Sequence, residues 1–521
     1  MSIMNRHIAA IIMVMPLLVS CNWLDISPEN TVDEKDLFTT GYGFRNALNG
    51  VYLTMGSPEV YGKNLSWGFL SAVAQEYLTD NSIQGSNSHQ LSKDAADLKF
   101  ETTTTKPVVD EIWKTQYSII ANVNKILEHI DDLDKSKFAY GDEERELIRA
   151  EALALRAMLH FDLLRLYAPA PATSPAGTYI PYREEFSAGI GNKLTVTQVI
   201  EKCLKDIAAA EPLLKHFDTE YHPEAMYASM MTTPNASANA KYRYDSRTYI
   251  DDMGQFFWFR GWRINYMALL GLKARICMYA GKGYYPTARA AAMELYTSFY
   301  NDRMWVGFTP KDNVTCQLER RYTKLSDDVL MGAYYKNLST DFESVLAGAD
   351  NSVKYPLAGI QELFASDMTG VYDDWRYTYL LAQTNTSNKS FYTLKYSTSV
   401  EPNVSAIENP MIPLIRFSEV LYILAEISAS ENDIGKGIEY LEAVRRGRGA
   451  ERSLALTVST SEQLIEEIIQ DARKEFLCEG NMFYMYKRLN RLQVPSSSDP
   501  GTMRDMSTAY VLPIPSSESP F

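Results

Sequence analysis

The amino-acid sequence predicts a mainly α-helical protein built on tetratricopeptide-like helix pairs. Several long segments place apolar residues three and four positions apart, which is the period of an amphipathic helix. Two of these segments share one plan, a helix followed by a short break and a second helix, and they align with each other. Stretches rich in Ser, Thr, Asn, Asp, Gly and Tyr separate the helical segments. Together these observations predict a helical scaffold that carries long loops.

The start of the chain has the pattern of an export sequence. Arg6 and the initiator amine supply positive charge, and residues 8–18 form an apolar run that is shorter than the ~20 residues needed to cross a bilayer. The run ends in Leu18-Val19-Ser20-Cys21, which looks like the lipobox of bacterial lipoproteins. We therefore predict a signal peptide over residues 1–20 and lipid attachment at Cys21. The alternative is an ordinary signal peptide beside a chance cysteine.

Lipidation would attach the rest of the protein firmly to a membrane, because two acyl chains anchor stably whereas one does not. We expect a short tether over residues 21–35. Residues 21–521 as a whole, with this tether included, are expected to form a single domain in which helices and ligand-binding loops alternate.

Four helices are predicted in the first half of the chain. The segment 143–167 is apolar almost all round, which indicates a buried central helix that ends before Pro169. Its Glu151 and Asp162 share a face near Arg165, so a buried ion pair is expected there. The other three helices cover residues 44–55, 109–130 and 195–214, and the last of them begins with the capping box Thr195-x-x-Gln198.

Two later segments have the plan of a helix pair. Residues 262–300 are interrupted at Gly281-Lys282-Gly283, and residues 416–446 are interrupted at Glu431-Asn432-Asp433. Aligning Leu270 with Leu421 places Ala274 on Ala425 and Gly281 on Asn432. This spacing matches a tetratricopeptide-like repeat of ~34 residues, in which small side chains let two helices approach closely. A last helix is predicted over residues 461–488.

Three irregular regions lie between the helices, at residues 79–105, 219–260 and 300–404. Long loops in a compact protein are functional or disordered. The tyrosines and tryptophans of these regions argue against disorder, so we expect them to carry the function.

Composition excludes some classes of partner and site. The formal net charge of −14 argues against binding to nucleic acid or to an anionic membrane surface, because both require a basic face. Beyond Cys21, the cysteines show no CxxC spacing; they are Cys203, Cys277, Cys316 and Cys478. The first two lie on apolar helix faces, which predicts buried free thiols.

No catalytic residue, metal site or cofactor is predicted. The six histidines lack an HExxH spacing, and His160 is expected to be a hydrogen-bonded core residue. Nucleophile-elbow, Walker and complete EF-hand motifs are absent. The acidic pairs Asp251-Asp252, Asp327-Asp328 and Asp373-Asp374 are interpreted as solvated loop acids, since a glycosidase needs two carboxyls at a set separation in space.

Several short motifs, in order and spacing, resemble the SusD/RagB family over nearly the whole chain. They begin with Cys21-Asn22-Trp23-Leu24-Asp25 and continue with Arg149-Ala150-Glu151-Ala152, Arg156-Ala157, Phe161-Asp162-Leu163, Pro413-Leu414-Ile415-Arg416, Glu419-Val420-Leu421, Ala425-Glu426, Val444-Arg445-Arg446, Arg473-Lys474-Glu475-Phe476, Glu479-Gly480, Leu512-Pro513-Ile514-Pro515 and Glu518. Many relatives have an arginine after the Glu-Gly pair, where this chain has Asn481-Met482-Phe483. An ion pair of that arginine is therefore expected to be missing.

The resemblance implies four tetratricopeptide-like pairs, with loops and a few short strands forming a binding face on one side. Family members are lipid-anchored to the outer membrane, face the cell exterior and cap a TonB-dependent SusC-like barrel. They bind an oligosaccharide, or peptides in some branches, pass it to the barrel and catalyse no reaction. A peptide-binding member, a surface glycoside hydrolase and a purely structural lid of the barrel remain as alternatives.

Candidate sugar contacts follow from the chemistry of a pyranose ring. Its C–H face packs on aromatic rings, and its hydroxyls bond to polar side chains. Candidates from loop-like regions and from one helix break are Trp67, Asp80, Asn81, His89, Trp258, Tyr284, Tyr285, Trp305 and Trp375. Trp113 and Trp262 are weaker candidates because they lie on helical patterns. For each candidate, core packing is the alternative.

Overall fold

The computed structural model describes residues 34–77, 87–187, 189, 191–226, 243–244, 254–315, 322–347, 353–364, 374–384, 390–398, 408–450, 454, 457–497, 499 and 501–518. The proposed lipid site Cys21 and its tether up to residue 33 lie outside these residues, as do Asp80, Asn81, Asp251, Asp252, Cys316 and Asp373.

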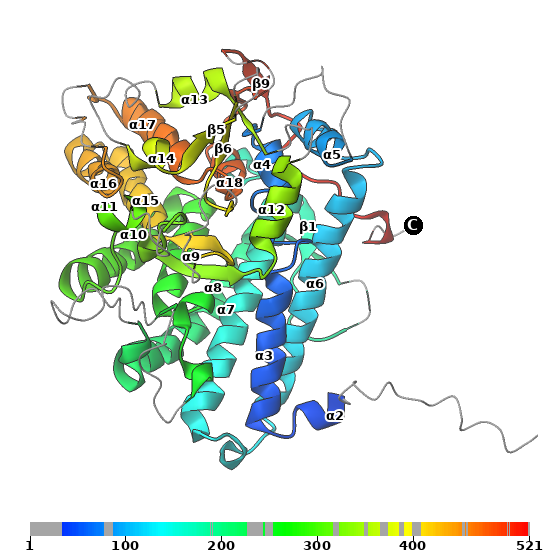
Figure 1. Cartoon of the computed structure of the whole chain (residues 1–521). Helices are drawn as coiled ribbons and strands as arrows, with labels where there is room; N and C mark the ends of the chain where they lie inside the picture. Colours follow the sequence, from blue (N-terminus) through cyan, green and yellow to red (C-terminus); the bar gives the residue numbers. More distant parts are fainter. Residues whose placement is uncertain are drawn as a thin grey trace, which may run out of the picture.

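The protein is mainly α-helical, as predicted. Neighbouring helices along the chain pack on each other from α3 to α17, in the manner of a helical repeat (Figure 1). The principal helices are α3 (Gly41–Met55), α6 (Lys106–His129), α7 (Gly141–Tyr167), α8 (Val196–His216), α9 (Tyr266–Ala280), α10 (Tyr285–Glu294), α15 (Phe417–Ser430), α16 (Ile434–Arg446), α17 (Ser461–Glu475) and α18 (Asn481–Arg488). The capping box of Thr195 and Gln198 begins α8, and α7 ends directly before Ala168.

The two predicted helix pairs are α9 with α10 and α15 with α16, and each pair is packed together. Gly281 has a φ of 102° and Asn432 a φ of 62°, so both breaks contain a residue with a positive φ. Glycine adopts such angles freely, and asparagine is among the few other residues that do. The alignment of Gly281 with Asn432 therefore identifies equivalent turn positions.

The prediction of one last helix over residues 461–488 was wrong, because the chain turns between α17 and α18. Cys478 and Gly480 have φ values of 63° and 71°. A β-carbon on Gly480 would lie 2.4 Å from the carbonyl oxygen of Leu65, so the close approach of the two backbones requires glycine.

Short strands and helices occupy the regions predicted to be irregular, and several gather at one end of the molecule (Figure 1). Antiparallel pairing joins β3 (Val329–Tyr334) to β7 (Met411–Arg416), with Val329 opposite Arg416, and β7 leads directly into α15. The other strands are β1 (Thr178–Pro181) with β2 (Lys193–Thr195), β4 (Tyr355–Pro356) with β6 (Ser390–Thr393) and β5 (Leu381–Gln383), and β8 (Gln493–Pro495) with β9 (Met503–Asp505). The short helices are α2 (Glu34–Leu37), α4 (Phe69–Val73), α5 (Asn87–Ala96), α11 (Lys311–Thr315), α12 (Leu338–Ala347), α13 (Leu357–Leu363) and α14 (Trp375–Thr378).

The central helix α7 is buried along most of its length, as predicted. Asp162 forms a buried ion pair with Arg165. His160 donates from Nδ1 to the carbonyl oxygen of Arg156 at 2.9 Å and accepts from the amide of Arg183 at 2.8 Å, and burial lowers its pKa to about 3. It is thus a neutral, hydrogen-bonded core residue. Cys203 and Cys277 are buried free thiols, also as predicted. Within the described residues, no helix is both long enough and apolar enough to span a bilayer.

A network of buried ion pairs, which we term the junction cluster, joins the loops to the C-terminal helices. Each of its three arginines contacts carboxylates from at least two residues. Arg416, for example, bonds to Glu479 at 2.8 Å through Nε and to Asp328 at 2.9 Å through Nη1. The cluster consists of Asp328, Asp374, Arg376, Arg416, Arg448, Asp471, Glu475 and Glu479.

The prediction that the acidic pairs are solvated was wrong for the members that the structure describes. Asp327 is buried, and Asp328 and Asp374 are fully enclosed in the junction cluster. The burial of Asp328 and Asp374 is stable because arginines pair with them, whereas an unpaired buried carboxylate would be costly.

The carboxyl of Glu76 forms no ion pair with the described residues. Glu76 accepts a hydrogen bond from the amide of Cys478 at 2.9 Å, and its second oxygen is also buried. Burial raises the pKa of Glu76 to about 7. Met482, from the segment after the Glu-Gly pair, lines the same small hollow as Glu76.

Candidate ligand-binding site

A hollow of about 570 Å³ opens beside α3, and we term it the α3 hollow. Its walls come from α3, from the turn at residues 255–263 and from the end of β3. This volume lies within the ~300–1,000 Å³ that is usual for small-molecule sites. The aromatic residues of the wall are Tyr42, Tyr52, Phe256, Trp258, Phe259, Trp262 and Tyr334, and the polar ones are Arg45, Asn46, Asn49, Gln255 and Arg263.

The first wall is the outward face of α3. Phe44, Leu48, Val51 and Met55 are buried in the core, and Thr40 caps the helix by accepting from the amide of Gly43. The opposite face presents its exposed side chains at helical spacing, and these are Tyr42, Asn46, Asn49 and Leu53. Because the core face fixes the rotation of the helix, the amides and the tyrosine must face the hollow.

The second wall is the turn that precedes α9. Trp258 is buried and meets the ring of His222 edge to face at 4.9 Å. Phe259 has a φ of 59°, a left-handed conformation that is strained for an aromatic residue. A β-carbon on Gly261 would lie 2.3 Å from the ring of Tyr244, so only glycine fits there. The surroundings therefore impose an unusual conformation on this turn.

Beneath the hollow, buried carboxylates of α7 hold its polar side chains in place. Glu151 accepts from the hydroxyl of Tyr52 at 2.6 Å and from Nε of Arg263 at 2.9 Å, and it also pairs with Arg260. Nε of Arg260 bonds in turn to Asp218 at 2.7 Å. These bonds cross-link α3, α7 and the turn, so the floor of the hollow is preorganised.

A second carboxylate of α7 fixes the arginine on α3. Arg45 makes two parallel bonds to Glu144, at 2.6 Å and 2.7 Å, and its guanidinium stacks 5.0 Å from the ring of Phe256. Burial and the neighbouring Glu151 raise the pKa of Tyr52 well above its usual range, so its hydroxyl stays neutral. Among the described residues that line the hollow, none is acidic.

This lining can bind a flat, polyhydroxylated ligand. Aromatic rings offer faces for apolar C–H groups, and amides and guanidinium groups bond to oxygens. Within the described residues, no three His, Cys, Asp or Glu side chains gather as a metal site requires.

The structure does not gather the sequence-predicted candidates into one site. Trp258 lines the α3 hollow, as does Trp262, which the sequence ranked lower because of its helical pattern. The indoles of Trp67 and Trp305 are buried, and Nε1 of Trp67 donates to the carbonyl oxygen of Gly62 at 2.8 Å. Both rings therefore pack in the core, and neither lines the hollow.

The remaining described candidates lie apart from the hollow. His89 is buried in α5. Tyr284 and Tyr285 lie at the start of α10, half-buried on the core. Trp375 begins α14 and packs on a separate small apolar cluster. As sugar contacts, these residues and Asp80 and Asn81 remain predictions.

Sequence reasoning missed all of the wall residues on α3. The available sign was the outward face of that helix, where Tyr42, Asn46 and Asn49 stand in place of the charged residues usual on a solvated face. The contribution of Tyr334 depends on the pairing of β3 with β7, which local sequence does not reveal.

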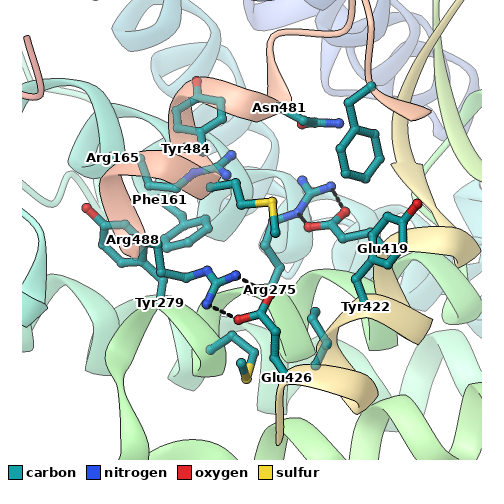
Figure 2. Close-up of a pocket in the computed structure, with 14 residues that line it drawn as sticks. Phe161, Arg165, Arg275, Tyr279, Glu419, Tyr422, Glu426, Asn481, Tyr484 and Arg488 are labelled. Atoms are coloured by element: carbon teal, nitrogen blue, oxygen red, sulfur yellow. Dashed lines mark hydrogen bonds and ion pairs between the residues drawn. The ribbon is translucent and has the colours of Figure 1, made fainter. Parts of the chain in front are cut away.

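A second, smaller hollow lies where α7, α9, α15 and α18 meet (Figure 2). Figure 2 shows Arg488 directed at Glu426, with both bonds at 2.7 Å, and Arg275 directed at Glu419, with the Nε bond at 2.7 Å. Its volume of about 50 Å³ holds little more than water, and its carboxylates already bond to arginines. We therefore assign it to the packing of the scaffold.

Comparisons with known proteins give matches along the chain. Residues 22–250 match a family model described as "Starch-binding associating with outer membrane", and residues 349–518 match the model of the SusD family. The SusD-like protein P2 of Formosa agariphila is 22% identical across 99% of this chain and 97% of that protein. The SusD-like protein P25 of the same organism is 24% identical over 168 residues, which cover 31% of this chain and only 30% of that protein.

Solved structures share the fold. A SusD superfamily protein from Bacteroides thetaiotaomicron matches with a TM-score of 0.65 at 19% identity, covering 92% of this chain and 97% of the other. A putative sugar binding protein from Bacteroides vulgatus matches with a TM-score of 0.61 at 19% identity, covering 92% and 96%.

Proposed function

This chain belongs to the SusD/RagB family, and from that premise we propose that it is a cell-surface lipoprotein that binds an oligosaccharide and passes it to a TonB-dependent SusC-like barrel. Cys21 would carry the lipid and hold the protein on the outside of the outer membrane. The family model over residues 22–250, described as starch-binding and associated with the outer membrane, supports both the ligand class and the location.

The α3 hollow is the proposed binding site, and its lining is the observation that carries this proposal. Aromatic side chains stand beside amides and guanidinium groups in a hollow large enough for a short stretch of an oligosaccharide. Sugar rings need this mixture, because each has apolar faces and a rim of hydroxyls.

We propose binding without catalysis. Glycoside hydrolysis needs two carboxyls on either side of the scissile bond, ~5–10 Å apart. The described lining residues include no carboxyl at all, since Glu144 and Glu151 lie behind the wall and are engaged by arginines and Tyr52.

Binding can be tested by gel retardation with a panel of polysaccharides and by calorimetry with the oligosaccharides that derive from them. Wild-type protein is expected to bind at least one of them. Trp262→Ala and Tyr42→Ala should each weaken binding about fivefold, since loss of one stacking ring is worth roughly 1 kcal/mol. Phe186→Ala is the matched control, because this exposed aromatic lies outside the hollow and should change nothing.

Each other outcome has a defined meaning. An equal loss of affinity in the Phe186 variant would contradict the proposed site. If no polysaccharide retarded the protein, the proposed function would be contradicted. Binding to oligopeptides alone would indicate a peptide-binding member of the family. Release of reducing sugar by the purified protein would disprove the absence of catalysis.

The anchor has a separate test. Cys21→Ala should move the protein from the membrane fraction to the soluble fraction, and protease added to intact cells should digest the wild-type protein. Continued sedimentation of the variant with membranes would rule out lipid attachment at Cys21.

A further inference from the structure

The α3 hollow presents two guanidinium groups and no carboxylate among its described lining residues. Arg45 lies on α3 and Arg263 on the turn before α9, so the two cations reach the hollow from different elements. The protein as a whole carries a formal charge of −14. The local excess of positive groups in this hollow is therefore opposite in sign to the net charge of the molecule.

The carboxylates that balance these arginines lie away from the ligand space. Arg45 pairs with Glu144 and Arg263 with Glu151; both glutamates belong to α7, are fully buried and do not line the hollow. Among the described residues, each of the two arginines has only one carboxylate partner. The positive ends of these two ion pairs therefore face the hollow, and the negative ends face the core.

Arg263 also has a donor without an acceptor. Its Nε bonds to Glu151 at 2.9 Å and its Nη1 donates to the carbonyl oxygen of Phe256, but its Nη2 is buried with no hydrogen-bond partner among the described residues. The residue is only 6% exposed. A buried N–H group of a charged side chain is costly to leave unpaired, so an acceptor from a ligand would relieve this cost.

One aromatic ring holds both cations in place. The ring centroid of Phe256 is 3.9 Å from the guanidinium carbon of Arg263 and 5.0 Å from that of Arg45. Such stacking restricts planar guanidinium groups while leaving their edges free to donate. The two forks are thus fixed before any ligand arrives.

The other polar groups of the lining are neutral, so they offer no charged acceptor to a ligand that mainly donates hydrogen bonds. They are the amides of Asn46, Asn49 and Gln255 and the hydroxyls of tyrosines. A sugar hydroxyl both donates and accepts, and a carboxylate is its strongest acceptor in a protein. A carboxylate or sulfate on the sugar only accepts, which fits a wall of guanidinium donors.

We propose that the ligand of the α3 hollow is an acidic oligosaccharide, whose anionic substituent is bound by Arg45 and Arg263. The substituent is the carboxylate of a uronic acid or a sulfate ester, because both match the guanidinium fork. This inference rests on the proposed function, since it names the class of sugar that the same site takes.

The test uses calorimetry with the whole protein and matched pairs of oligosaccharides. One arm compares uronate-containing oligosaccharides with their carboxyl-reduced forms, and the other compares sulfated oligosaccharides with their desulfated forms. In at least one arm the acidic form should bind ten times more tightly or better, and this advantage should shrink between 50 mM and 500 mM salt as charges are screened. The arm that responds identifies the substituent.

Two variants connect the preference to the proposed cations. Arg45→Gln keeps an amide at a half-buried position and should lower the affinity for the acidic form much more than the affinity for the neutral form, so that most of the preference is lost. Arg446→Gln alters an exposed arginine on α16, outside the hollow, and should leave both affinities as they are.

Failure of the inference and failure of the proposed function look different in this design. Neutral forms that bind as tightly as acidic ones, or an unchanged preference in Arg45→Gln, would overturn the inference and leave oligosaccharide binding intact. If neither acidic nor neutral oligosaccharides bind, the proposed function fails, and the inference fails with it.

Discussion

The α3 hollow and the junction cluster both contain buried arginines, but they surround them differently. In the junction cluster, each arginine contacts carboxylates from at least two residues. At the hollow, Arg45 and Arg263 each pair with one carboxylate among the described residues, and their remaining N–H groups contact no second one. A guanidinium enclosed by anions holds segments together, whereas one held only from behind remains able to bind a ligand.

The difference also separates two tasks of the chain. The junction cluster connects Asp328 and Asp374, from the regions between helix pairs, to Glu475 and Glu479 at the end of α17 and beyond it. It therefore fixes the loops on the scaffold. The pairs at the hollow fix a wall, and substitutions of the exposed side chains of that wall should change affinity more than stability.

The largest expected effect comes from removing one cation of the junction cluster. Arg416→Met would leave Asp328 and Glu479 with fewer positive partners, and breaking a buried ion pair in this way costs about 3–5 kcal/mol. Chemical denaturation should show a correspondingly lower free energy of unfolding, or a protein that does not fold. A loss below about 1 kcal/mol would show that the cluster is not a main support of the fold.

Removing the charge of a buried carboxyl that forms no ion pair should have the opposite effect on stability. The pKa of Glu76 is raised from an ordinary value of 4.5 to about 7, so the native protein binds more protons than the unfolded chain between these pH values. Ionisation of Glu76 thus lowers the free energy of unfolding as the pH rises through this window. At higher pH the full destabilisation persists. Glu76→Gln should therefore stabilise the protein by about 1–3 kcal/mol at pH 8.

The same variant provides its own control at low pH. At pH 4 or below, Glu76 is protonated in both states, and the two proteins should unfold at nearly the same denaturant concentration. Equal stabilisation at pH 4 and pH 8 would point to packing and away from charge.

The wall of the α3 hollow should respond in affinity and hardly in stability. Asn46→Ala and Asn49→Ala remove exposed amides, so the free energy of unfolding should change by less than about 0.5 kcal/mol. Each change should weaken oligosaccharide binding about five- to tenfold, because a hydrogen bond contributes roughly 1 kcal/mol. Calorimetry and denaturation on the same samples measure both, and a large loss of stability would place these amides in the scaffold.

The smallest effect is expected for an ion pair that is neither buried nor near the hollow. Lys436 bonds to Glu439 at 2.6 Å on α16, with side chains 44% and 65% exposed. Lys436→Met should change the free energy of unfolding by no more than about 0.5 kcal/mol, since water screens such pairs. If Lys436→Met lowered the free energy of unfolding as much as Arg416→Met, burial could not explain the effect of the Arg416 substitution.

Much of the fold could be predicted because its determinants are local. The capping box at Thr195, the end of α7 before Pro169 and the matched turns at Gly281 and Asn432 depend on residues a few positions apart. The single last helix was wrong because the close approach of Gly480 to Leu65, a long-range contact, decides the break.

The candidate site was harder to predict because it joins distant segments. Tyr42, Trp258 and Tyr334 meet only after α3, the turn before α9 and β3 are packed together. Burial is equally non-local, so Trp67 and Asp328 resembled loop residues in the sequence but lie in the interior. Sequence patterns indicated the class of chemistry, whereas packing selected which aromatic residues can supply it.

The position of α3 near the start of the chain sets how far the proposed site can be from the membrane. Only twelve residues separate Cys21 from α2, which leads into α3. A fully extended chain of that length spans at most about 45 Å. If Cys21 is the anchor, the length of this tether and the length of α3 together limit the distance between the lipid surface and a sugar bound against α3. The bound sugar would therefore stay close to a pore in the same membrane.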